Sequence, residues 1–206
     1  RSTRHGGVSP RAAPNSSRPP IATPAATAPN TMPTSGSAAS AARPNGVRDR
    51  IGNTVPYTGP ASAYGVIGKV LAAYFDKVNA EGGINGRKIN FISYDDAYNP
   101  TKTMEVTRKL VEEDNVLFIL ASLGTNTSQA VHPYLNAKKV PQLFVASGAT
   151  MWDQPRDFPW TMGFLPSYQT EAHIYSHYIL ENHPRGKIAL LYQDDGFGKD
   201  YLKGLR

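Results

Sequence analysis

The sequence of 206 residues contains no cysteine, which excludes disulfide bonds, thiolate metal sites, a cysteine nucleophile and a lipid-anchored cysteine. It also has little net charge outside one segment. Seven of the 22 Lys and Arg residues and one of the 16 Asp and Glu residues lie in residues 1–50, and the remainder is neutral. The basic isoelectric point therefore does not indicate a nucleic-acid-binding core, and we expect no nucleic-acid partner.

The sequence also lacks a long apolar run. Residues 19–42 carry no charge, but they are rich in Ala, Ser and Thr and are interrupted by proline, so they do not predict a transmembrane helix. Ala39-Ser40-Ala41 resembles a signal-peptidase site, yet no Leu-rich core precedes it and no Met opens the chain. We therefore identify no signal peptide.

Residues 1–50 contain eight Pro, ten Ala and seven Ser, with almost no large apolar side chains. Such a segment buries too little surface to offset its conformational entropy, so we predict a disordered leader. A basic arm that binds nucleic acid or anionic lipid is the alternative, and an unfolded leader is the simpler interpretation.

From Ile51 onward, strand and helix patterns alternate. Helical spacing covers residues 66–82, Asn99-Pro100 predicts the start of a helix that runs to about residue 114, and further helices are expected at 127–138, up to 182, and from about 198. Strands are expected at 88–94, 116–121, 142–146, 160–164 and 187–192. This alternation predicts an α/β fold with a doubly wound parallel sheet.

Ligands of such sheets bind where strands lead into helices, which directs attention to the loops 95–99, 122–128, 146–150 and 193–198. The loops 122–128 and 146–150 are rich in hydroxyl groups, and free N–H groups at the start of a helix favour a carboxylate or phosphate. Gly148 permits close backbone approach. Simple N-capping by Thr125 or Thr127 is the alternative, but two such loops on neighbouring strands favour a shared anion site.

No catalytic or cofactor motif is present. The adjacent carboxylates of Asp95-Asp96 and Asp194-Asp195 point apart and are typical of loops and helix caps. His173 and His177 are spaced as metal ligands on a helix, but they lack the Glu that a zinc protease requires, so a surface pair is expected. Without a phosphate loop, a dinucleotide fingerprint or a nucleophile elbow, we predict no enzyme, no cofactor and no metal.

Several segments resemble type I periplasmic binding proteins, in particular the branched-chain amino acid receptors of ABC transporters. They are Gly-Asn-Thr-Val-Pro-Tyr-Thr-Gly-Pro at 52–60, Ala-Tyr-Gly at 63–65, Glu-Gly-Gly-Ile-Asn-Gly-Arg-Lys-Ile at 81–89, Tyr-Asp-Asp-Ala-Tyr at 94–98, Lys-Leu-Val at 109–111, Leu-Asn-Ala-Lys-Lys-Val-Pro at 135–141 and Phe-Gly-Lys-Asp-Tyr at 197–201. The resemblance spans residues 51–206. It implies two Rossmann-like lobes that close around a small molecule, an N-terminal lobe at 51–165 and an incomplete second lobe at 166–206.

The resemblance also implies roles for individual residues. Thr125 matches a hydroxyl that binds the ligand carboxylate, Gly148 and Thr150 match groups that hold the carboxylate and amino group, and Tyr64 and Phe197 match aromatic walls. The predicted ligand-binding residues are Tyr64, Thr125, Asn126, Ala146, Ser147, Gly148, Ala149, Thr150 and Phe197. The implied partners are an amino acid or similar small carboxylate and an ABC permease, and the implied location is the periplasm or the cell exterior.

Two features depart from the family pattern. Residues 47–50 include three charged side chains where relatives have an apolar strand, and the matching region is about half the length of a relative, as in a gene fragment or damaged gene. We expect a solute-binding, leucine-binding-like receptor for import. A ligand-sensing receptor or regulator with the same fold is the alternative, and an α/β enzyme is a third interpretation.

Overall fold

A computed structural model of the chain describes residues 49–206, so residues 1–48 of the predicted leader lie outside the described residues. The strands are β1 (Asp49–Val55), β2 (Ile89–Asp95), β3 (Phe118–Leu120), β4 (Gln142–Val145) and β5 (Thr161–Gly163). The helices are α1 (Val66–Ala80), α2 (Pro100–Arg108), α3 (Thr125–Lys138), α4 (Tyr168–Asn182) and α5 (Gly196–Gly204). Shorter turns are 3₁₀-helical at Ser62–Gly65 and Thr150–Trp152 and π-helical at Lys109–Glu113. Within residues 49–206, none of the helices has the length and apolarity needed to span a membrane.

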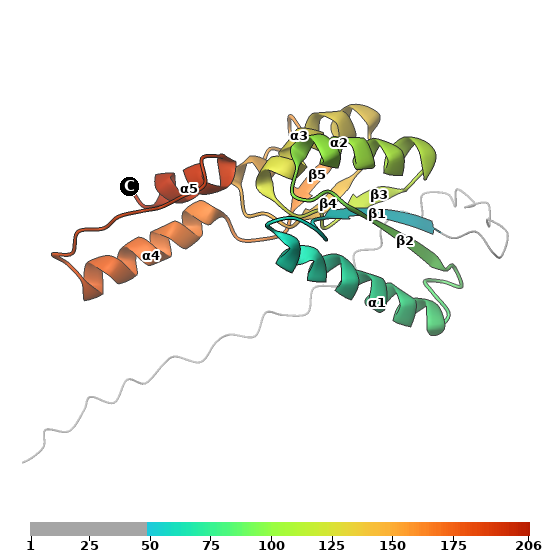
Figure 1. Ribbon diagram of the computed structural model, residues 1–206, viewed down its shortest axis with the longest axis horizontal. Helices are drawn as coiled ribbons and strands as arrows, with labels where there is room; N and C mark the ends of the chain where they lie inside the picture. Colours follow the sequence, from blue (N-terminus) through green and yellow to red (C-terminus); the bar gives the residue numbers. More distant parts are fainter. Residues whose placement is uncertain (1–48) are drawn as a thin grey trace, which may run out of the picture. The chain divides into compact units, whose positions relative to one another are not determined.

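The five strands form one parallel sheet in the order β2-β1-β3-β4-β5. Figure 1 shows α1 on one face of this sheet and α2 and α3 on the other. The chain runs outward from β1 to β2 and then returns to β3 on the other side of β1, so the strand order reverses between β1 and β3. The predicted doubly wound α/β fold is confirmed, and the reversal marks the edge where such sheets bind ligands.

Two of the charged residues that depart from the family pattern, Asp49 and Arg50, lie at the start of β1, just before the predicted start of the folded region at Ile51. Arg48 lies outside the described residues. Arg87 pairs with the carboxylate of Asp49, and Arg50 Nη1 donates a hydrogen bond of 2.7 Å to the carbonyl of Asp114. From Ile51 to Val55 every residue is buried. An inner strand therefore tolerates these charges because they are confined to its partly exposed end, where each finds a partner.

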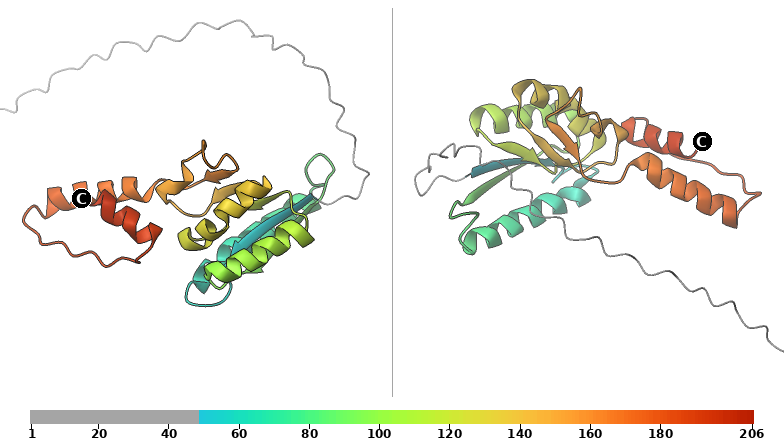
Figure 2. Two further views of the ribbon diagram at one scale, coloured as in Figure 1. Left: turned by 90° about the horizontal axis from the view of Figure 1, so that it is seen from above. Right: turned by 180° about the vertical axis from the view of Figure 1, so that it is seen from behind.

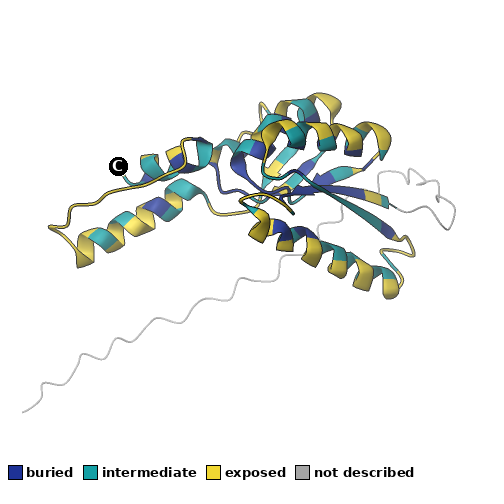
Figure 3. Cartoon of the chain, in the orientation of Figure 1, coloured by how far each residue is buried: buried dark blue, intermediate teal, exposed yellow. Residues whose placement is uncertain are grey.

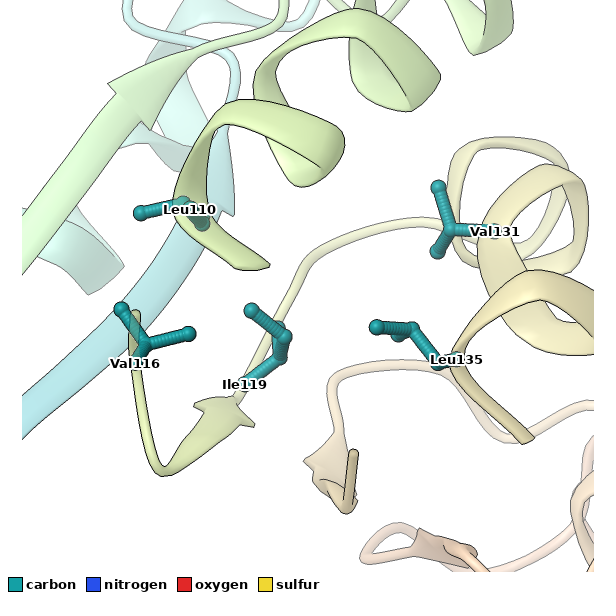
Figure 4. Close-up of a cluster of buried hydrophobic side chains, with 5 residues drawn as sticks. All are labelled: Leu110, Val116, Ile119, Val131 and Leu135. Carbon is teal, nitrogen blue, oxygen red and sulfur yellow. The ribbon is translucent and has the colours of Figure 1, made fainter. Parts of the chain in front are cut away.

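A cluster of aliphatic side chains forms the core on the face of the sheet that α2 and α3 cover (Figure 4). Its members are at most 7% exposed and are Leu110, Val116, Ile119, Val131 and Leu135. Burial of each large aliphatic side chain contributes about 1.5–3 kcal/mol, so this cluster anchors α3 and the π-helical turn that continues α2 to β3. The helix α2 begins as predicted, because the Asn99 side chain accepts hydrogen bonds from Thr101 N and Lys102 N and Pro100 occupies the first position.

The strand predicted at residues 187–192 is wrong, since this segment has no regular secondary structure. It joins α4 to α5, which pack side by side (Figure 2), and it is exposed (Figure 3). Leu191 is 100% exposed. A strand needs hydrogen-bonding neighbours, and none of the strands among residues 49–206 pairs with this segment, so its apolar pattern is not enough to make it one.

Candidate functional site

A cavity of about 490 Å³ lies at the carboxyl ends of the strands. Each of its walls on the sheet side comes from a segment that follows a strand: Tyr64 follows β1, Tyr98 follows β2, Thr125 follows β3, Ala146 follows β4 and Leu165 follows β5. The opposite wall comes from the residues before and within α4 and α5. The cavity therefore occupies the position where parallel α/β sheets bind small molecules.

The two hydroxyl-rich loops lie side by side, as the sequence predicted. Leu123 and Ala146 form an isolated parallel bridge beyond β3 and β4, and Thr125 Oγ1 lies 2.8 Å from Ser147 Oγ. Capping of α3 by Thr125 or Thr127 is wrong, because Gly124 occupies the N-cap position and no side chain caps the helix. Instead, Thr127 donates a hydrogen bond to the carbonyl of Leu123 at 2.5 Å, and the Thr125 hydroxyl is shared with the neighbouring loop.

The carboxylates of Asp95 and Asp96 shape the loop that carries Tyr98 to the cavity. Asp95 Oδ1 accepts from Ala97 N at 3.0 Å and Asp96 Oδ1 accepts from Tyr98 N at 2.9 Å, which confirms their predicted loop role. Ala97 and Tyr98 both have positive φ, of 49° and 59°, a conformation that is uncommon outside glycine. Burial raises the pKa of Asp96. Burial also raises the pKa of Tyr98, and a hydrogen bond with Gln193 only partly offsets this rise.

Gly124 lets the Tyr98 ring approach the start of α3. Its φ of 101° is in the region that favours glycine, and an added Cβ would lie 2.6 Å from both Thr127 Oγ1 and Tyr98 Cε2. The glycine therefore permits two features at once, the sharp turn into α3 and the contact with the tyrosine ring beside Thr125.

Aromatic rings form the wall opposite the hydroxyl loops. The Phe197 ring packs edge-on against Tyr168 and Tyr201, with centroids 4.9 and 5.3 Å apart, and these two tyrosines stack at 5.1 Å. The Tyr201 hydroxyl donates a hydrogen bond of 2.6 Å to Glu171 Oε2. Burial raises the pKa of Tyr201 and the bond to Glu171 raises it further, so this phenol is neutral at physiological pH.

The structure brings four of the predicted ligand-binding residues together in the cavity and places the other five elsewhere. The cavity is lined by Tyr64, Thr125, Ala146 and Phe197. The second loop turns away, with Gly148, Ala149 and Thr150 lining an adjacent hollow of about 610 Å³, whereas Asn126 is half-buried on α3 and Ser147 is buried beside Thr125. Sequence reasoning missed Tyr98, Leu165, Tyr168, Gln193 and Tyr201. Three of them had a signal, because Tyr98, Leu165 and Gln193 each follow a predicted strand. Tyr201 lies in the family-like segment 197–201, and Tyr168 had no signal.

The cavity offers hydroxyl groups, one amide and aromatic faces, and its lining contains no Asp, Glu, Lys, Arg or His. Such a surface binds a small molecule through hydrogen bonds and apolar contact, and it contains no acid–base pair near the reversal of the sheet. His173 and His177 are both exposed on α4, and residues 49–206 contain no cluster of three potential metal ligands.

A family model described as "Periplasmic binding protein" matches residues 50–206. The chain is 24% identical over 130 residues to the leucine-specific-binding protein of Salmonella typhimurium, covering 63% of this chain and 34% of that protein. It is 26% identical over 151 residues to Leu/Ile/Val-binding protein homolog 2 of Brucella abortus, covering 72% of this chain and 40% of that protein. The chain thus spans well under half the length of these relatives.

Solved structures agree with these sequence matches. A substrate-binding periplasmic protein from Ralstonia solanacearum superposes with a TM-score of 0.69 at 26% identity, over 76% of this chain and 44% of that one. A possible leucine/isoleucine/valine-binding protein from Rhodopirellula baltica superposes with a TM-score of 0.70 at 24% identity, over 79% and 44% of the two chains. The family comprises solute receptors and not enzymes, in line with the absence of catalytic motifs from the sequence. The chain belongs to the periplasmic binding protein family.

Proposed function

We propose that this chain contributes to the substrate-binding component of an ABC importer and binds an amino acid or a related small carboxylate. The observation that carries the proposal is the cavity at the reversal of the sheet, where the Thr125 loop faces the aromatic wall of Phe197, Tyr168 and Tyr201. Relatives named for binding leucine, isoleucine and valine support an amino-acid ligand.

The arrangement gives each wall a separate task. The hydroxyl of Thr125 and the free N–H groups at the start of α3 suit a carboxylate, because the helix dipole favours negative charge there. The aromatic rings suit an apolar side chain, since they exclude water and present flat faces. We assign residues 51–165 to the first lobe, residues 166–206 to the start of the second lobe, an ABC permease as partner, and the periplasm or cell exterior as location.

Replacement of Thr125 tests this proposal, with Thr127 as a matched control. Both hydroxyls are buried at the start of α3, but only Thr125 lines the cavity. A hydrogen bond to a charged group contributes about 1.5–3 kcal/mol, so Thr125→Ala should weaken binding of leucine, isoleucine or valine about tenfold to a hundredfold. Titration followed by NMR measures even millimolar affinities. Thr127→Ala should lower the melting temperature and leave the affinity unchanged.

The two variants separate a binding role from a structural one. Thr125→Ala removes one hydrogen-bond partner of the Ser147 hydroxyl, and Thr127→Ala removes the bond to the Leu123 carbonyl, so a moderate loss of stability is expected with either variant. If Thr125→Ala lowered the melting temperature but left the affinity for every amino acid unchanged, the hydroxyl would serve only to join the two loops, and the carboxylate site would be wrongly placed.

A further inference from the structure

Residues 187–192 form an apolar stretch of chain whose backbone is unpaired. The segment reads Lys-Ile-Ala-Leu-Leu-Tyr, and all of its residues are exposed, Leu191 completely. Among residues 49–206, no hydrogen bond involves a backbone N–H or carbonyl group of this segment. Figure 2 shows the segment as an open loop between the end of α4 and the start of α5.

Such a segment is suited to pairing with another strand. Ile188 and Tyr192 are residue types that favour strands, and the two leucines between them add apolar side chains that a neighbouring strand can cover. Unpaired backbone groups beside exposed apolar side chains favour pairing with a second chain. None of the strands among residues 49–206 pairs with this segment, so the neighbour that it requires has to come from outside these residues.

The charges at the two ends of the segment make it complementary to a second copy of itself. Lys187 lies at one end and Asp194 just beyond the other, and both side chains are exposed. If two copies lie antiparallel, Lys187 of each copy comes close to Asp194 of the other, so opposite charges meet at both ends. A parallel arrangement would place like charges together, which is unfavourable. The ion pair of Asp194 with Lys199 of its own chain is largely exposed, so it opposes this contact only weakly.

We propose that two copies of the chain associate through residues 187–192, which pair as antiparallel strands with Lys187 and Asp194 at the ends of the contact. This inference goes beyond the proposed function and does not depend on which ligand the cavity binds. A two-stranded pair is only marginally stable by itself. Association is therefore weak and depends on concentration, so dilute samples contain monomers and concentrated samples contain dimers.

Analytical ultracentrifugation of the whole 206-residue chain over a range of concentrations tests the proposal. Lys187→Asp and Asp194→Lys each place like charges at both ends of the contact, so each should raise the dissociation constant of the dimer about tenfold or more. An equimolar mixture of the two variants again has opposite charges at both ends and should form a mixed dimer about as readily as the wild type. Lys69→Asp is the matched control, because Lys69 is exposed on α1 and the charge change is the same. This variant should leave the dissociation constant unchanged.

Amide hydrogen exchange followed by NMR measures the backbone pairing directly. In an antiparallel pair, every second N–H of a strand points to the neighbouring strand. Amides of alternate residues within 188–192 should therefore exchange more slowly in concentrated than in dilute samples. If a dimer formed but these amides exchanged equally fast at both concentrations, the contact would not be a pair of strands and the proposal would be overturned.

The remaining outcomes each overturn the proposal and identify a different partner for the segment. A wild-type chain that stayed monomeric but showed slow exchange within 188–192 would mean that another part of the same chain covers it. A monomer that bound to neutral phosphatidylcholine vesicles would mean that the segment contacts lipid. Association that Lys187→Asp and Asp194→Lys left unchanged would mean that the chains meet elsewhere or through unspecific apolar contact. A monomer with fast exchange and no binding to vesicles would mean that the segment has no partner.

Discussion

The carboxylate of Asp95 joins three segments at the edge of the cavity. Its Oδ1 accepts from the backbone N–H groups of Tyr57, Thr58 and Ala97 at 2.8, 3.0 and 3.0 Å. Its Oδ2 accepts from the Thr58 hydroxyl at 2.6 Å and from the Lys102 ammonium at 2.9 Å. One side chain thus fixes the loop after β1, the loop that carries Tyr98 and the first turn of α2.

Asp95→Asn should separate the contributions of the two oxygens. The amide oxygen can still accept the three backbone N–H groups, but the NH₂ group that replaces Oδ2 is a donor and faces two other donors. Hydrogen bonds to charged groups contribute about 1.5–3 kcal/mol each, and partial exposure of the Asp95–Lys102 pair (25% and 41%) reduces its share. We expect the free energy of unfolding to fall by about 2–3 kcal/mol at pH 7.

The free energy of unfolding lost in Asp95→Asn should become smaller as the pH falls. Burial alone would raise the pKa of Asp95, but the hydrogen bonds from Lys102, Thr58 and Ala97 outweigh it and hold the pKa well below its usual value. A lowered folded-state pKa gives stability that is complete above the unfolded pKa and is lost as the pH falls through the folded pKa. The difference in the free energy of unfolding between wild type and Asp95→Asn should therefore be constant from about pH 5 to 8 and decrease below about pH 4.

Urea unfolding followed by circular dichroism at pH 7 and pH 3 measures both effects. Asp194→Asn is the control, since its ion pair with Lys199 at 3.0 Å is largely exposed and its loss should have little effect. If Asp95→Asn differed from the wild type by less than about 0.5 kcal/mol at pH 7, the ordinary range for surface substitutions, the role given to Oδ2 would be refuted. If the difference in the free energy of unfolding were as large at pH 3 as at pH 7, the lowered pKa of Asp95 would be contradicted.

Two further predictions concern glycine and an exposed leucine. Gly124→Ala should lower the melting temperature and weaken amino-acid binding, because the new Cβ would collide with Thr127 and Tyr98. An unchanged melting temperature and affinity would show that the turn accommodates the methyl group without cost. Leu191→Lys should leave the melting temperature unchanged and reduce self-association measured by light scattering, because Leu191 is fully exposed in an apolar segment. Self-association equal to that of the wild type would show that this segment is not where the chains contact each other.

Much of the fold could be predicted because its signals are local. The start of α2 depends on Asn99 and Pro100, which act within one turn of the helix, and the end of α1 lies just before the glycines at 82 and 83. Residues 187–192 have an equally apolar pattern, yet they form no strand. A strand depends on neighbours far away in the sequence, and the pattern of a segment does not state whether those neighbours are beside it.

The sequence by itself determined that the chain folds as a parallel α/β sheet and which loops follow its strands, because turn chemistry and hydrophobic periodicity are local properties. Only the tertiary structure decided how those loops are used. Thr125 and Ser147 are 22 positions apart and Thr150 and Asp200 are 50 apart, so their pairing depends on how distant elements pack. The same packing turns Thr125 of one hydroxyl loop toward the cavity and brings the carboxylate of Asp200 to Thr150 of the other, because elements far apart in the sequence meet only in the folded chain.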